Sequence, residues 1–136
     1  MKNNDFRSSA YGLYLSGDAE STFSGNSFYQ ISSSEIAVTG NSHDLNFTDE
    51  LNISNLYVEA GSNLTVKQLR LGNSITYANF TDIFINDTVD TVQNPSSFEF
   101  STNSFNLSST ANPGLNKSAT IAVSYTHLTL PTKRIV

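Results

Sequence analysis

The feature that most constrains this chain is a short apolar pattern that returns at constant spacing. Each occurrence is a pair of apolar residues with one other residue between them. The interval from one pair to the next is the same throughout the series Leu45 and Phe47, Leu64 and Val66, and Ile83 and Ile85. Within a strand, residues i and i+2 lie on one face, and a repeat of about 20 residues places each pair above the previous one. The pattern predicts a β-solenoid.

A second series of apolar pairs alternates with the first. Its members are Ile36 and Val38, Leu56 and Val58, and Ile75 and Tyr77. Leu13 and Leu15 precede this series by a longer interval than the later pairs show, and they indicate a looser first coil. Two strands in each coil give an all-β fold, a parallel β-helix of about 3–5 coils with about 19–23 residues each.

The pattern also divides the chain. Residues 1–10 are polar and are expected to form a frayed edge or an incomplete coil, and residues 11–92 are expected to form the β-helix coils. Residues 93–123 leave the register and are predicted to form a last coil or capping strands. Gly-Asn pairs, among them Gly40-Asn41 and Gly72-Asn73, are expected at the corners between strands, because both residues tolerate positive φ.

The final segment, Ser124 to Val136 (SYTHLTLPTKRIV), departs in composition from the residues before it and lacks the apolar pairs. It resembles the translated adapter sequence that ends some reading frames assembled from environmental DNA. We therefore expect it to be a non-native tail and exclude it from the fold prediction.

Composition narrows the classes of function. Asn, Ser and Thr number 16, 21 and 14 of the 136 residues, the net charge is −5, and cysteine is absent. Without a basic patch, nucleic acid is not an expected partner. No segment has the run of about 20 apolar residues needed for membrane insertion, and the N-terminus lacks the charged start and apolar core of a signal peptide. No cofactor and no metal site are predicted.

Seven Asn-X-Ser/Thr sequons mark candidate glycosylation sites. They begin at Asn46, Asn52, Asn63, Asn79, Asn86, Asn106 and Asn116. Ser and Thr are so frequent that composition alone produces several of them, and a glycosylated exterior and coincidence are both open. Since Asn46 lies between the inward-facing Leu45 and Phe47, it is expected to face outward.

An acidic group is the candidate for catalysis. It consists of Asp44, Asp49 and Glu50, near His43, with Asp82 and Asp87 one or two coils further on. Glycoside hydrolysis requires two carboxyl groups about 5–9.5 Å apart, and a lyase requires a basic group and several oxygen ligands for Ca²⁺. Solvated charges at corners are the simpler interpretation, and no catalytic residue is assigned.

The outward faces of the coils carry polar residues together with Tyr57 or Tyr77. Such a surface binds glycans by stacking and hydrogen bonding, or it is a hydrated wall without a ligand. Both alternatives stay open.

Two stretches resemble known proteins. The coils with Gly-Asn corners, Leu13 to Ile85, resemble the right-handed parallel β-helix repeats of pectate-lyase-like proteins. The segment NPGLNKSATIAV, Asn112 to Val123, resembles one that follows such repeats in large predicted surface proteins of archaea. The resemblance implies a secreted or wall-associated parent protein of adhesin type.

We therefore expect a structural or adhesive module of an extracellular or cell-surface protein, with glycans or other cell-surface components as partners. The alternative is a polysaccharide lyase or glycoside hydrolase of the β-helix type.

Overall fold

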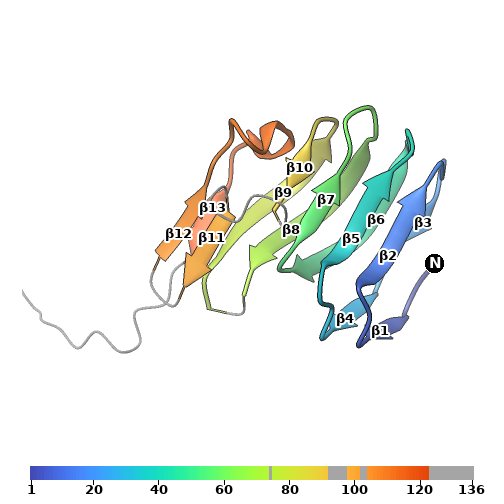
Figure 1. Ribbon diagram of the computed structural model, residues 1–136, viewed down its shortest axis with the longest axis horizontal. Coiled ribbons are helices and arrows are strands. Elements are labelled where there is room, and N and C mark those ends of the chain that lie inside the picture. Colours follow the sequence, from blue (N-terminus) through green and yellow to red (C-terminus); the bar gives the residue numbers. More distant parts are fainter. Residues whose placement is uncertain (74, 92–97, 102–103, 123–136) are drawn as a thin grey trace, which may run out of the picture.

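The computed structural model describes all residues except 74, 92–97, 102–103 and 123–136. The secondary structure of the described residues is nearly all β, and its strands form a β-solenoid of about three turns. In Figure 1 the colours run from blue at one end to orange at the other, so the coils are stacked in sequence order. The predicted all-β solenoid is therefore confirmed. The expected tail, residues 124–136, lies outside the described residues.

The first eight strands form what we call the parallel stack. They are β1 (Asp5–Arg7), β2 (Tyr11–Ser16), β3 (Thr22–Phe23), β4 (Ser27–Tyr29), β5 (Ser34–Thr39), β6 (Leu45–Ile53), β7 (Leu56–Val58) and β8 (Leu64–Gly72). Their pairing is parallel throughout: β1 with β4, β2 with β5 and β5 with β7, β3 with β6 and β6 with β8. Residues 1–10, at the N-terminal end, thus contribute β1.

The registers within the parallel stack follow the apolar repeat. Leu13 is paired with Ile36 and Ile36 with Leu56, while Leu45 is paired with Leu64. These side chains are almost completely buried. Phe23 stacks on Phe47 with ring centroids 4.6 Å apart, which extends the core between coils.

The remaining elements form what we call the antiparallel end. They are β9 (Tyr77–Ile85), β10 (Val89–Asp90), β11 (Phe98–Ser101), β12 (Ser104–Leu107), the 3₁₀ helix η2 (Pro113–Leu115) and β13 (Thr120–Ala122). β9 is antiparallel to β8 and to β13, and β10 is antiparallel to β7. β11 and β12 form an antiparallel pair within residues 93–123.

The third set of apolar pairs therefore requires a correction. Ile83 and Ile85 do stack on Val66 and Leu64, but in reversed direction, with Leu64 opposite Ile85. The predicted continuation of the second series through Ile75 is wrong, because Ile75 is 43% exposed. Val89 of β10 is instead paired with Val58, the position predicted for Tyr77.

The reversal is made by a tight turn after β8. Gly72 has φ +145°, and Asn73 accepts hydrogen bonds at its side-chain oxygen from the backbone N–H groups of Ile75 and Thr76, at 2.8 and 2.7 Å. Asn73 N–H also donates to the Thr76 carbonyl at 2.9 Å. Gly72-Asn73, expected to be a corner of a coil, thus forms a β-hairpin turn instead.

Two sheets face each other across the core. A four-stranded sheet has the order β10-β7-β5-β2, and a five-stranded sheet has the order β13-β9-β8-β6-β3. Within the described ranges, no helix has the length and apolar content needed to cross a membrane.

Candidate functional site

A groove of about 740 Å³ lies on the outer face of the four-stranded sheet. Its described lining comes from β2, β5, β7, β10 and the adjoining loops. The lining residues are Tyr11, Tyr14, Ser16, Ser33, Ser34, Ala37, Thr39, Gly40, Tyr57, Glu59 and Asp90. We call this feature the tyrosine groove.

The floor of the groove consists of small residues, because the residue of β5 that lies between the two tyrosines in the sheet is an alanine. Ala37 is paired with Tyr14 on one side and with Tyr57 on the other. Ile36 and Val38 point into the core, so Ala37 between them faces outward, where it is fully covered at the bottom of the groove. The other lining residues from β5 and its flanking loops, Ser33, Ser34, Thr39 and Gly40, are small too.

The spacing of the strands sets the width of the groove. Neighbouring strands lie about 4.8 Å apart, so the β2 and β7 backbones that carry Tyr14 and Tyr57 are separated by about 9.5 Å. Ala37 lies between them in the sheet, and both tyrosines line the groove. Aromatic side chains in a groove offer flat apolar faces on which the ring of a ligand can stack.

The wall contributed by β2 is aromatic and open to solvent. Tyr11 and Tyr14 meet edge to face with ring centroids 5.1 Å apart, and their exposures are 41% and 57%. An aromatic side chain of this exposure leaves a ring face available for stacking.

The opposite wall carries negative charge. Glu59 is held in place because one of its carboxylate oxygens accepts a hydrogen bond from Gly40 N–H at 2.7 Å, and Asp90 is paired with Tyr57 across the strands. Among the described residues that line the groove, none is Lys, Arg or His. Burial, and then the charges of Glu59 and Asp90, raise the pKa of the Tyr57 hydroxyl, which therefore stays protonated at neutral pH.

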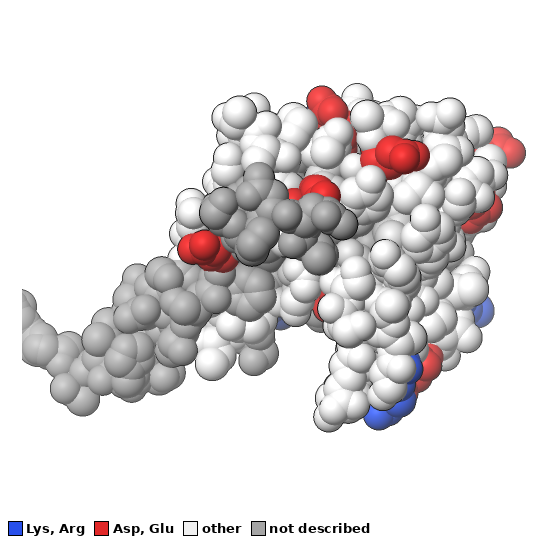
Figure 2. All heavy atoms as spheres, in the orientation of Figure 1, with Lys and Arg blue, Asp and Glu red and all other residues white. Residues whose placement is uncertain are grey.

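Figure 2 shows the distribution of charge on one face of the molecule. Red Asp and Glu side chains are spread over its upper part, where no blue Lys or Arg side chain is visible. This part of the surface is thus acidic, in agreement with the net charge of −5.

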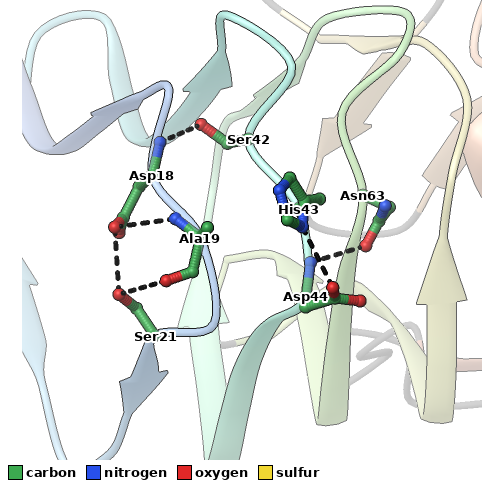
Figure 3. Close-up of polar contacts among 7 residues, drawn as sticks. All are labelled: Asp18, Ala19, Ser21, Ser42, His43, Asp44 and Asn63. Atoms are coloured by element: carbon green, nitrogen blue, oxygen red, sulfur yellow. Dashed lines mark hydrogen bonds and ion pairs between the residues drawn. The ribbon is translucent and has the colours of Figure 1, made fainter.

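Residues of the predicted acidic group have separate polar contacts in the structure. Asp44 lies at a corner, next to the His43 ring at 3.0 Å, and its backbone N–H donates to Asn63 at 2.9 Å (Figure 3). The same corner is linked to the preceding coil, since Asp18 N–H donates to the Ser42 hydroxyl at 3.0 Å. These contacts hold adjacent coils together.

The other acidic residues lie elsewhere. Glu50 on β6 forms an ion pair with Arg70 at 3.2 Å, and Asp82 on β9 forms one with Lys67 at 3.1 Å. Asp49 is exposed on β6, and Asp87 is in the loop after β9, where it accepts a hydrogen bond from Thr88 N–H. In the described part of the chain, no group of three or more His, Asp or Glu side chains is arranged to hold a metal ion.

The sequons differ in accessibility. Five of the asparagines are exposed: Asn46, Asn52, Asn86, Asn106 and Asn116. The outward orientation predicted for Asn46 is thus confirmed. Asn63 and Asn79 are half-buried, and their side-chain oxygens accept hydrogen bonds from Asp44 N–H and from the Gln68 amide.

The sequence pointed to one residue of the tyrosine groove and missed the others. Tyr57 is in the groove, whereas Tyr77, the other aromatic candidate, is half-buried with the Arg70 guanidinium 3.8 Å above its ring. The registers of the coils contain a signal for Tyr14, because the interval from Tyr14 to Ala37 equals the interval from Leu13 to Ile36. Asp90 could not be found in this way, because it belongs to an antiparallel strand.

Comparison of the chain with known protein families, with curated proteins and with solved structures found no match.

Proposed function

We propose that this chain is a structural and adhesive module of an extracellular surface protein and that its tyrosine groove binds glycans. The observation that carries the proposal is the row Tyr14–Ala37–Tyr57, which brings two aromatic side chains into one groove beside small residues. Sugar rings stack on aromatic faces, and their hydroxyl groups find partners in the serines, Thr39 and the carboxylates of the lining.

The extracellular location and the parent protein are part of the same proposal. Five exposed sequons support a surface that tolerates attached glycans. The resemblance of the coils to pectate-lyase-like repeats, and of residues 112–123 to archaeal surface proteins, supports a wall-associated parent of adhesin type.

An enzymatic alternative has one observation in its favour. Glu59 and Asp90 lie in the same groove as Tyr57, and a pair of carboxyl groups is the minimum equipment for glycoside hydrolysis. A β-helix polysaccharide lyase or glycoside hydrolase would then use this groove rather than the predicted acidic group.

The test is a glycan-array screen of the full 136-residue chain, followed by mass analysis of the bound glycans. We expect binding with no change in glycan mass. The variant Tyr14→Ala is expected to weaken binding by about fivefold, the equivalent of about 1 kcal/mol. Tyr29→Ala is the matched control, since Tyr29 is similarly exposed, at 55%, but lies on β4 outside the groove.

Shortened or unsaturated glycans would favour the enzymatic alternative. Equal binding by Tyr14→Ala and the unaltered chain, with both folded by circular dichroism, would refute the groove as the binding site.

A further inference from the structure

The charge of the tyrosine groove restricts which glycans it accepts. Its lining combines Glu59 and Asp90 with hydroxyl groups from serine, threonine and tyrosine side chains. Carboxylates accept hydrogen bonds and cannot donate them when ionised, so the best partners for this wall are donors. Hydroxyl and ammonium groups of sugars are donors, and their hydrogen bonds to a carboxylate are of the strong, charge-assisted kind.

We infer that the tyrosine groove selects non-anionic glycans, whose hydroxyl or ammonium groups donate to Glu59 and Asp90 while a ring stacks on Tyr14, and that it rejects polyuronates. This inference rests on the proposed glycan-binding function and names the ligand class. A uronate carboxylate in the groove would face two like charges, with no cation among the described lining residues to offset them.

The position of each carboxylate supports this assignment. Glu59 uses one oxygen for the bond to Gly40 N–H, and that bond fixes the direction of the side chain. Asp90 is adjacent to Tyr57, and both acidic groups act electrostatically on the Tyr57 hydroxyl, which places their charge at the wall of the groove. The protonated Tyr57 hydroxyl adds one more group that can donate or accept.

The experiment measures dissociation constants of the full chain for three hexasaccharides by isothermal titration calorimetry. These are N-acetylglucosamine (neutral), glucosamine (ammonium-bearing) and galacturonate (anionic) oligomers. We expect at least one of the first two to bind tenfold or more tightly than galacturonate. If the chain prefers the glucosamine oligomer and this preference falls when NaCl is raised from about 20 to about 500 mM, the donors are ammonium groups. If the glucosamine and N-acetylglucosamine oligomers bind with equal affinities that do not change with salt, the donors are hydroxyl groups.

The variants Glu59→Gln and Asp90→Asn test the role of the carboxylates. Both amides keep an acceptor oxygen, and the Glu59→Gln side chain can still accept from Gly40 N–H, so the fold is expected to persist. We expect each to reduce the discrimination against galacturonate by about three- to tenfold. Asp49→Asn is the control, because Asp49 is exposed on β6 and lies outside the groove.

The outcomes separate the two proposals. Tightest binding of galacturonate, or unchanged discrimination in both groove variants, would overturn this inference and leave the glycan-binding function standing. If none of the three oligomers binds and the glycan array is also negative, the proposed function fails and this inference fails with it.

Discussion

The parallel stack and the antiparallel end bury the same kind of apolar pair but are built by opposite rules. In the parallel stack, β8 lies beside β6 and runs in the same direction, with Leu64 opposite Leu45. At the antiparallel end, β9 lies on the other side of β8 and runs in reverse, with Leu64 opposite Ile85. One strand thus serves as the border between a repetitive architecture and one that terminates it.

The difference teaches that periodicity defines which residues face the core and leaves the direction of the chain open. A pair of apolar residues at i and i+2 looks the same when read backwards. The inward face of β9 therefore fits the inward face of β8 in either direction, and a local turn decides between them. Reversal also ends the continuous parallel ladder on this side of the stack, which is one way to limit edge-to-edge association.

The largest loss of stability is expected at Leu64, whose side chain packs against both regions. Leu64 is fully buried between Leu45 and Ile85. Leu64→Ala should lower the free energy of unfolding by about 4 kcal/mol through lost burial and the cavity that remains. Chemical denaturation measures this, and Thr65→Ala, at an exposed position of the same strand, should change stability by about 0.5 kcal/mol or less. Equal effects of the two substitutions would mean that β8 is not the border of the core.

The second largest loss of stability is expected in the turn after β8, which reverses the chain. A Cβ at Gly72 would lie 2.3 Å from the Thr76 carbonyl oxygen, and φ there is +145°. Gly72→Ala should cost about 3 kcal/mol. Hydrogen exchange should then show that β9 loses protection while β2 and β5 keep theirs.

Gly17→Ala is the control for this substitution. Its φ is +68°, but the nearest atom to an added Cβ is 3.9 Å away, so only the backbone conformation is penalised, by about 1 kcal/mol. If Gly72→Ala left β9 as well protected as in the unaltered chain, the turn would not be what fixes the direction of β9.

A smaller loss of stability is expected from a substitution where β10 contacts the parallel stack. The buried Thr91 hydroxyl accepts from Leu56 N–H at 3.0 Å and lies 3.2 Å from the Asn55 side-chain oxygen. Thr91→Val removes the acceptor and leaves the buried Leu56 N–H without it, at a cost of about 2 kcal/mol. Thermal unfolding followed by circular dichroism checks this, and Thr91→Ser should restore most of the loss because it retains the hydroxyl.

The smallest effect concerns a surface contact between the two regions. Arg70 on β8 forms an ion pair with Glu50 of β6 and stacks on Tyr77 of β9. Both charged side chains are about a third exposed, and Arg70→Gln should therefore cost only about 0.5–1 kcal/mol. A double-mutant cycle with Tyr77→Leu separates the stacking contribution, and zero coupling would show that this contact does not link the regions.

Much of the fold could be predicted from the sequence. The i, i+2 pairs, recurring at nearly constant steps, placed Leu13, Ile36 and Leu56 in one column and Leu45 and Leu64 in another, and the observed registers agree. This worked because within a parallel stack each coil repeats the geometry of the one before it. Exposure of Asn46 between two buried residues followed from the same alternation.

The candidate site was less accessible to sequence reasoning. Tyr14 and Tyr57 are far apart in the chain, and they come together only because each is paired with Ala37 of β5. The acidic residues that stood out in the sequence, around Asp49, were chosen because they are close along the chain. In the structure Asp44 lies beside His43 at the corner before β6, whereas Glu50 lies further along β6 and pairs with Arg70.

The sequence by itself thus determined the solenoid, the inward face of the coils in the parallel stack and the acidic, hydroxyl-rich character of the surface. Only the tertiary structure decided that β9 runs backwards and that Asp90 joins Glu59 and Tyr57 in one groove. The physical reason is that side-chain alternation is a local property of a strand. Strand direction and the convergence of distant side chains depend on turns and on pairing between segments far apart in the chain.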